Sequence, residues 1–275
     1  MLQFHNSEFR VSGVGIMCQS ISINEQPFLS PVYAIGFRGN AYQTPSGPIK
    51  TTISTNYFCE VTGDIPNKLV NQIKNYDFNS SPCVVSIAGK TGSAYLTKYS
   101  LSCSPNQAVI ASADYDIYHE LSGEFTRQNP NLIPSYNPSN ASGIAHYWSS
   151  YIKSHDSLVT GALVSFNYSC SLNWLPIYTI GTGRHIPTEV KLMDGREQFF
   201  FSHENAVRGT YSGQAIESSI PAFHKIELYP ASFAFGLFTT NKITLWLASG
   251  IIVGNRLNFQ EDSVIMNETL INKYF

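Results

Sequence analysis

The sequence predicts a mainly β protein with two tandem β-barrel or β-sandwich domains, each holding at most one short helix. Three observations lead to this fold class: strand-type alternation dominates the chain, helix signals are few, and one short motif occurs twice. We expect the first domain at residues 1–126, a linker rich in Pro, Asn and Ser at 127–142, and the second domain at 143–275. A chain of 275 residues is long enough for one large all-β domain or two domains of ordinary size, and at 43% apolar it can bury a full core.

The clearest strand signal is Val164–Leu172, where apolar residues alternate with Ser and Asn. A period of two is typical of a strand with one buried face. Further strand candidates are Ile49–Phe58, Cys83–Ala88, Ala108–Ala113, Phe199–Ser202, Ala231–Phe238 and Ile243–Val253. Turn residues separate these segments, among them Pro45–Pro48 and Asp194–Gly195.

Two segments have helical spacing. Pro66–Tyr76 places Leu69 and Ile73 four residues apart, with Pro66 at the first helical position. If Ile144–Ile152 is a helix, one of its faces carries four apolar residues, namely Ile144, Trp148, Tyr151 and Ile152. In both segments we interpret these residues as core contacts.

A six-residue motif, P-[VI]-Y-x-I-G, occurs as Pro31–Gly36 and again as Pro176–Gly181. The same offset aligns Ser20–Asn24 with Ser165–Ser169, so that polar residues match polar ones and apolar residues match apolar ones. Each copy is therefore predicted to be an alternating strand, a loop of about six residues, and then the motif.

The residues that follow the motif extend the similarity. A basic residue comes soon after each copy, Arg38 in the first and Arg184 in the second. Leu101–Tyr118 and Leu257–Tyr274 also share an apolar spacing, more weakly. We interpret the chain as an internal duplication of one β-rich domain.

The charge content is unusually low. Only 13% of the residues are charged, 17 basic and 19 acidic, and aromatic residues also make up 13%, whereas roughly a quarter of a typical soluble domain is charged. The net charge of -2 gives no electrostatic case for a nucleic-acid binder. Because little repulsion opposes association, the composition favours a subunit of an assembly.

Targeting signals and disulfide patterns are missing from the sequence. The first residues lack the basic and apolar regions of a signal peptide, and Asn241 and Lys242 interrupt the apolar Ala231–Gly254, which favours a β-hairpin over a membrane helix. The five cysteines form no C-x-x-C pair and are an odd number, so we expect buried free thiols rather than disulfides or zinc ligands: Cys18, Cys59, Cys83, Cys103 and Cys170.

No catalytic, cofactor-binding or metal-binding motif is complete. Gly89–Thr91 lacks the earlier glycine of a phosphate-binding loop and is predicted to be a hairpin turn, and the histidines are too scattered to form a metal site. We therefore expect that the protein is not an enzyme and carries no cofactor. A hydrolase with a carboxylate pair stays as a third hypothesis, with these candidate residues: Glu60, Asp64, Asp114 and Asp116.

The repeated motif resembles the tail-tube fold of bacteriophage tails, in which an alternating strand leads through a short loop into a similar P-x-Y-x-I-G segment followed by arginine. The matching residues are Pro31, Tyr33, Ile35, Gly36 and Arg38, then Pro176, Tyr178, Ile180, Gly181 and Arg184. The predicted helix at Pro66–Tyr76 stands between strands, as the resemblance implies. The second half departs from the pattern, since its connection after the motif is shorter and no clear helix follows.

The resemblance implies a virion structural protein, a tail tube or tail hub subunit that lines the DNA channel. The resemblance implies stacked rings of six domains each. A duplicated chain would supply two of these domains and would therefore form a homotrimer with pseudo-sixfold symmetry. Its partners would be other copies in the ring, adjacent tail rings, and tail-tip or neck proteins, with no membrane. DNA would pass without specific binding through a slightly acidic channel lined by Ser and Asn. The protein would be located in the virion after assembly in the host cytoplasm.

The alternative is a carbohydrate-binding or adhesin protein, a two-domain β-sandwich on a virion or cell surface. The aromatic content motivates this alternative because exposed Trp and Tyr rings stack on sugars. The candidate residues are Trp148, Trp174 and Trp246. A core position for these tryptophans is the competing interpretation.

Overall fold

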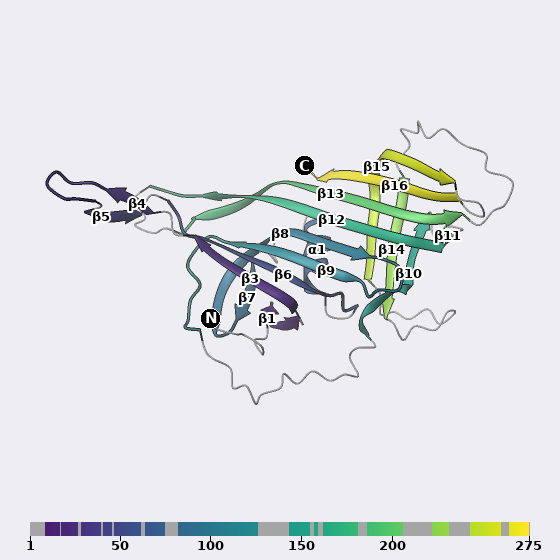
Figure 1. The fold of residues 1–275 in the computed structure, drawn as a ribbon, viewed down its shortest axis with the longest axis horizontal. Helices are drawn as coiled ribbons and strands as arrows, with labels where there is room; N and C mark the ends of the chain where they lie inside the picture. Colours follow the sequence, from purple (N-terminus) through teal and green to yellow (C-terminus); the bar gives the residue numbers. More distant parts are fainter. Residues whose placement is uncertain are drawn as a thin grey trace, which may run out of the picture.

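The computed structural model of the chain is mainly β, with one short helix (Figure 1). It describes residues 9–16, 18–26, 29–39, 41–45, 47–61, 64–74, 82–125, 143–154, 157–158, 162–180, 186–205, 222–230, 243–259 and 264–274. The predicted linker at 127–142, the strand candidate Ala231–Phe238, Gly181 and Arg184 lie outside these residues.

The elements of the first half are β1 (Phe9–Val11), β2 (Val14–Ile16), β3 (Cys18–Gln26), β4 (Leu29–Val32), β5 (Tyr42–Pro45), β6 (Lys50–Phe58), α1 (Ile65–Lys74), β7 (Cys83–Ile87), β8 (Lys90–Cys103) and β9 (Ile110–Ile117). Those of the second half are β10 (Ala145–Ser154), β11 (Ser157–Leu158), β12 (Ala162–Ile177), β13 (Glu189–Asn205), β14 (Ala222–Pro230), β15 (Ile243–Phe259) and β16 (Val264–Tyr274).

Strand pairing follows the same order in each half, and all pairs are antiparallel. In the first half β3 pairs with β6, β6 with β9, and β9 with β8. In the second half β12 pairs with β13, β13 with β16, and β16 with β15. The start of β8 pairs with β7, which continues to β1 and β2, and the start of β15 pairs with β14, which continues to β10 and β11.

One strand pair joins the two halves into a single sheet. Lys98–Cys103 of β8 lies antiparallel to Phe166–Ser171 of β12. The sheet therefore runs without interruption from β3 through β8 and β12 to β15, while β4 and β5 form a separate hairpin. In Figure 1 this hairpin projects at the left, beyond the main sheet.

The alternation of Val164–Leu172 is confirmed as part of β12. Tyr168, Cys170 and Leu172 are buried, because their side chains point from alternate positions of the strand into the core. The other strand candidates within the described residues are confirmed as well, although the strands that contain Phe199–Ser202 and Ile243–Val253 are longer than predicted, at Glu189–Asn205 and Ile243–Phe259. The two-residue turn between β7 and β8 is formed by Ala88 and Gly89, which have φ angles of 48° and 86°. Positive φ at both central residues is typical of a type I′ hairpin turn.

The predicted helix at Ile144–Ile152 is wrong, since Ile144 forms an isolated bridge with Glu60 and the residues that follow belong to β10. Between Ala145 and Ser150 the pairing with β14 shifts register, and the Ser150 hydroxyl donates to the carbonyl of His146 at 2.9 Å. Within this shift His146 forms a bridge with Ala108 and the backbone amide of Tyr147 donates to the carbonyl of Gln107, so the strand leaves the regular pairing with β14 and its apolar positions have a spacing near four. Aromatic and Ser residues are weak helix formers, so the pairing with β14 decides the conformation.

The turn predicted at Asp194–Gly195 is also wrong, because β13 continues through both residues. The turn signal coincides with a β-bulge: Asp194 pairs with Asn173, whereas Leu192 pairs with Trp174, so Met193 has no partner across the strand pair. The loop predicted before the second motif copy is wrong for a related reason, since β12 is one unbroken strand up to Ile177.

The helix predicted at Pro66–Tyr76 is confirmed as α1, which begins one residue before Pro66. Leu69, Val70 and Ile73 are buried against the sheet, as their helical spacing indicates. The thiols of four cysteines are buried and free, as predicted, and Cys18 is half-buried.

Candidate assembly surfaces

Both copies of the motif lie where a long β-hairpin ends. In the first half, Pro31 pairs with Gln43 in the β4–β5 hairpin, and in the second half Pro176 pairs with Val190 in the β12–β13 hairpin. β3 and β6 continue toward the first hairpin, so the strands on either side of it form one extended pair in two pieces. The structure thus places both motifs at hairpin tips, which the sequence alone did not indicate.

The isoleucine at the fifth position of each motif copy is fully exposed. Ile35 has a relative exposure of 107% and Ile180 of 102%, and Tyr33 and Phe37 are also largely exposed at 72% and 69%. Because these large apolar side chains are not buried, they contribute no hydrophobic stabilisation to the fold of the free chain. We name the described residues 33–39 and 178–180 the hairpin tips.

Backbone hydrogen bonds shape the first tip. The amide of Phe37 donates to the carbonyl of Ala34 at 3.2 Å, and the amide of Ala41 closes the loop on the carbonyl of Val32 at 2.9 Å. Gly36 adopts a φ of 95° in this turn, a conformation that favours glycine. Arg38 follows as an exposed residue.

The second tip is closed by a threonine. The amide of Thr188 donates to the carbonyl of Ile177 at 2.8 Å, and its hydroxyl bonds the same carbonyl at 3.0 Å. The hydroxyls of Thr179 and Thr188 are 3.0 Å apart. Tyr178 is 38% exposed beside this closure.

A second surface is formed by the side of the main sheet that faces away from the core. Two rows of cross-strand neighbours run over β3, β6, β9, β8, β12 and β13. The first row is Ser20, Asn56, Ser112, Ser100, Ser169 and Gln198, and the second is Ser22, Ser54, Asp114, Lys98, Ser171 and Arg196. We name these twelve residues the polar face.

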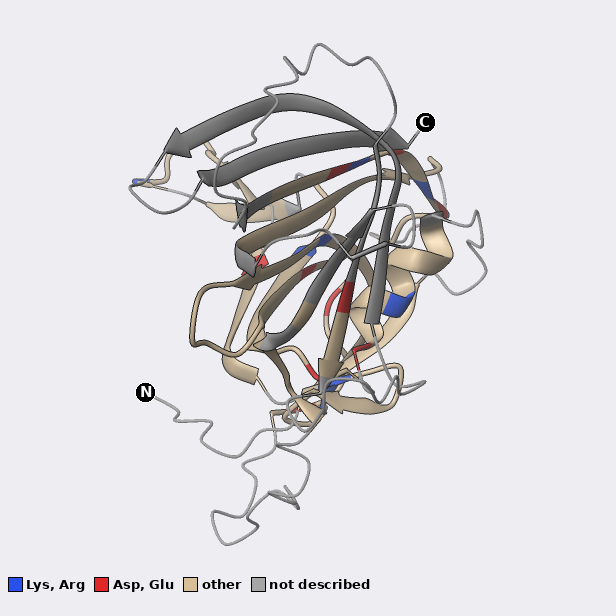
Figure 2. Ribbon diagram, turned by 90° about the vertical axis from the view of Figure 1, so that its right-hand side faces the viewer, with Lys and Arg blue, Asp and Glu red and all other residues tan. Residues whose placement is uncertain are grey.

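Every residue of the polar face is exposed or half-buried. The first row has no charge, and the hydroxyls of Ser100 and Ser112 are 2.6 Å apart within it. In the second row Lys98 lies directly across from Asp114. Figure 2 shows how few residues of the described strands are charged. The polar face therefore carries two cations, Lys98 and Arg196, and one carboxylate, Asp114, among nine uncharged polar residues.

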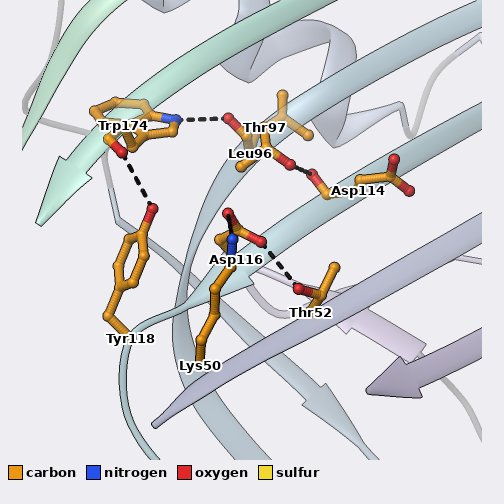
Figure 3. Close-up of polar contacts among 8 residues, drawn as sticks. All are labelled: Lys50, Thr52, Leu96, Thr97, Asp114, Asp116, Tyr118 and Trp174. Carbon is orange, nitrogen blue, oxygen red and sulfur yellow. Dashed lines mark hydrogen bonds and ion pairs between the residues drawn. The ribbon is translucent and has the colours of Figure 1, made fainter. Parts of the chain in front are cut away.

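Side-chain contacts join four strands, one set on the side of the polar face and one on the core side of the sheet (Figure 3). Asp116 of β9 pairs with the amine of Lys50 at 2.8 Å and accepts from the hydroxyl of Thr52 at 3.1 Å. The indole of Trp174 donates from β12 to the carbonyl of Leu96 on β8 at 2.7 Å. Because these contacts cross between strands, they hold the register of the sheet.

A buried carboxylate holds the helix to the other side of the sheet. Asp64 accepts from the hydroxyl of Tyr99 at 2.7 Å, from that of Tyr57 at 3.0 Å, from the thiol of Cys59 at 3.4 Å and from the amide of Asn67 at 3.2 Å. It is thus the N-cap of α1. Burial raises the pKa of Asp64 above its usual range, while the four hydrogen bonds act in the opposite direction.

The candidate carboxylates do not gather into one site. Asp64 is on the core side of the sheet, whereas Asp114 and Asp116 extend from alternate positions of β9 on the other side. Asp64 is fully engaged by its donors, and Asp116 is ion-paired. The described residues contain no group of three or more His, Cys, Asp and Glu that could hold a metal ion.

Trp174 is a core residue, since it is 8% exposed and its ring lies 5.2 Å from that of Tyr95. The side chains of Trp148 and Trp246 lie outside the described ones. Among the helices of the described part, none is long and apolar enough to cross a membrane.

The sequence matches no protein-family model and no curated protein.

Of the motif residues, Pro31 and Pro176 lie in strands, whereas Tyr33, Ile35, Gly36, Tyr178 and Ile180 are brought to the hairpin tips. Sequence reasoning missed the polar face as a continuous surface. Its signal was the Ser and Asn residues between the apolar positions of single strands, but only the register between strands assembles them into rows.

Proposed function

We propose that this chain is a duplicated, ring-forming structural protein of a bacteriophage virion, a tail tube or tail hub subunit that assembles as a trimer with pseudo-sixfold symmetry. In this proposal the chain is not an enzyme. The observation that carries it is the order of strand pairing, which is the same in β3-β6-β9-β8 and in β12-β13-β16-β15.

The positions of the bulges support a duplication. In the β3–β6 pair the register shifts at Gln19, and in the β12–β13 pair it shifts at Val164, which is the offset that separates the motif copies. The β8–β9 pair shifts at Thr97 and the β15–β16 pair at Val253. Bulges are conserved within families of related domains, so bulges at matching positions point to a common origin of the two halves.

The junction between β8 and β12 supports the ring. It sets the two halves edge to edge, with their strands in one sheet. Domains joined edge to edge by a head-to-tail contact form a ring when the same rotation, repeated from domain to domain, closes. Three chains would supply the six domains that the tail-tube resemblance implies.

The polar face supports a channel through which DNA slides. Tight DNA binding needs several lysines or arginines that neutralise phosphates. The first row of the polar face has no cation, and the second row has two, Lys98 opposite Asp114 and Arg196 opposite Ser171. We propose that this face is turned toward the lumen, where phosphates meet hydroxyl and amide groups.

The exposed hairpin tips support contacts with further copies or with other tail proteins. Tyr33, Ile35 and Phe37 would be covered when rings stack, which removes their apolar surface from water. Trp174 lies in the core, so this tryptophan gives the carbohydrate-binding alternative no support.

The test is the assembly state of the purified full-length chain. Native mass spectrometry should find a species of three chains, and negative-stain electron microscopy should find rings or short tubes with a central opening. Monomers alone, at concentrations up to the solubility limit, would contradict the proposal. Dimers of twofold symmetry would contradict it as well, because they bury one shared patch and leave no channel.

A further inference from the structure

The main sheet ends at an edge strand, β3, with few features that would prevent pairing with another chain. β3 pairs with β6 along one edge, and among the described strands none pairs with its other edge. It is nine residues long, contains no Pro or Lys and has one charged residue, Glu25, and its bulge at Gln19 stands before the seven regularly paired residues Ser20–Gln26. Edge strands of monomers usually carry such charges, prolines or bulges to prevent pairing with another chain. Ile21 and Ile23 are moreover only half-buried.

The other end of the same sheet is the second part of β15. Residues 251–259 pair with β16 along one edge, and no other described strand pairs with this part of β15. The corresponding part of β8 in the first half does have a partner on its second edge, which is β12.

The β8–β12 junction is a template for how these two ends would meet. Six residues of β8 pair there with six of β12, from Cys103 opposite Phe166 to Lys98 opposite Ser171. β12 corresponds to β3 through the matched bulges at Val164 and Gln19, and β15 corresponds to β8 through those at Val253 and Thr97. When each residue of the β8–β12 register is replaced by its counterpart, the result is a register for a pair formed by β15 and β3.

We propose that β15 of one chain pairs antiparallel with β3 of a second copy, so that the sheet continues from subunit to subunit around the ring. The transferred register sets Phe259 opposite Ile21, Asn258 opposite Ser22, Leu257 opposite Ile23 and Arg256 opposite Asn24. This inference rests on the proposed ring and names the surfaces that close it.

The pattern of residue types agrees with this register. Apolar residues meet apolar ones in the pairs Phe259–Ile21 and Leu257–Ile23, and polar residues meet in the pair Asn258–Ser22. A shift by one residue would set every isoleucine of β3 opposite a polar residue, because successive residues point to opposite faces. The two edges differ in sequence, so the contact is head-to-tail, and in the proposed trimer three such contacts close the ring.

The test is a disulfide between chains. One full-length variant carries Ser22→Cys and another carries Asn258→Cys, both with Cys18→Ser to remove the half-buried native thiol of β3. After mixing and mild oxidation we expect a two-chain product on a non-reducing gel. A variant with both substitutions should give a three-chain product at the mass of the ring.

A matched control is built into the chain. Ser102 and Asn167 are opposite each other in the β8–β12 junction and correspond to Asn258 and Ser22. The variant with Ser102→Cys and Asn167→Cys should form its disulfide within one chain, in a yield within about twofold of the yield between chains, since opposite residues of antiparallel strands are within disulfide reach. Ser22→Cys combined with Asn255→Cys, which is out of register by three residues, should react at least about tenfold less, given that strands rise roughly 3.3 Å per residue.

The outcomes separate the two proposals. Rings without a Ser22–Asn258 disulfide, beside an efficient in-chain control, would overturn the β15–β3 contact and leave the proposed function standing. A stronger reaction of the out-of-register pair would overturn the register. If neither rings nor cross-linked products form, both proposals fail.

Discussion

The hydroxyl of Tyr99 donates a 2.7 Å hydrogen bond to the carboxylate of Asp64, and this bond connects the centre of β8 with the first turn of α1. Both residues are buried. Hydrogen bonds to a buried carboxylate are stronger than those between neutral groups, so this contact fixes the only described helix on the sheet.

Replacing Asp64 should therefore destabilise the fold. Asp64→Ala removes the N-cap of α1 and leaves the hydroxyls of Tyr57 and Tyr99 without this acceptor. We expect the free energy of unfolding to fall by about 3 kcal/mol, combining a lost cap with buried unpaired donors. Urea unfolding monitored by circular dichroism measures the change. Tyr99→Phe removes one donor and should cost about 1 kcal/mol, so equal losses in the two variants would contradict this account.

Stability should also depend on pH through Asp64. Because burial raises its pKa in the folded state, the folded chain binds the proton more tightly than the unfolded chain. Stability then falls as pH rises from the unfolded pKa of about 3.9 through the raised folded value, and levels off above it. Asp64→Asn has no proton to lose, so the difference in urea midpoint between wild type and this variant should change over that window. A difference that stays constant with pH would show that the pKa of Asp64 is not raised.

Trp174 should be a stability residue. Trp174→Phe keeps an aromatic ring beside Tyr95 but removes the indole bond to the carbonyl of Leu96. We expect a loss of about 1–2 kcal/mol in the free energy of unfolding, because a buried carbonyl loses its donor. Binding on a glycan array should be unchanged from wild type. A loss of glycan binding at wild-type stability would instead favour the carbohydrate-binding alternative.

The hairpin tips should matter for assembly and not for folding. Ile35→Asp and Ile180→Asp place a charge on fully exposed side chains, so the free energy of unfolding should change by less than about 0.5 kcal/mol. Stacking of rings should be reduced, because a carboxylate would be buried in an apolar contact. Sedimentation velocity and electron microscopy measure the distribution of tubes and single rings.

The control for the tips is Asn106→Asp, which adds the same charge at an exposed turn between β8 and β9. It should leave stacking at the wild-type level. If all three variants reduce stacking equally, net charge rather than the tips would be responsible.

The polar face should acquire DNA affinity when cations are added. Asn56→Lys, Ser112→Lys and Gln198→Lys place three amines in the first row of this face. We expect the assembled triple variant to bind duplex DNA, with an affinity that falls steeply as salt rises, since three neutralised phosphates give a slope of roughly -2.7 in log–log form. Fluorescence anisotropy with labelled DNA at several salt concentrations measures this slope, and wild type should show little binding.

A variant with the same number of lysines elsewhere separates lumen from outer surface. Ser12→Lys, Ser104→Lys and Asn106→Lys are at exposed turns away from the polar face. DNA held inside rings of the first variant should be protected from nuclease, whereas DNA on the control should be digested. Equal digestion in both would contradict a lumen position of the polar face.

Much of the fold could be predicted from single segments. The strand pattern of Val164–Leu172 and the helical spacing of Leu69 and Ile73 depend on burial of one face, which local periodicity records. β10 could not be predicted in this way, because its register shift beside His146 imitates a helical spacing. The turn signal at Asp194–Gly195 marked a bulge for a similar reason: small and polar residues suit both turns and bulges.

The candidate surfaces were less predictable than the fold. The motif copies could be found from the sequence, but the exposure of Ile35 and Ile180 depends on where the hairpins end. The first row of the polar face requires six strands in register, and no local pattern sets the pairing of Ser100 with Ser169 across the two halves. The role of Asp64 was hidden because Tyr99, which donates its shortest hydrogen bond, lies 35 residues away in the sequence, on β8.

The β8–β12 junction has a consequence for mass action in the proposed ring. Since this contact exists within each chain, every second junction of the ring is held at a fixed effective concentration and does not weaken on dilution. Only three bodies have to meet, so the yield of rings follows the third power of chain concentration instead of the sixth. The two halves of one chain also differ in sequence. Alternate domains around the ring therefore present different surfaces, and a partner can bind to one kind of domain and not to the other.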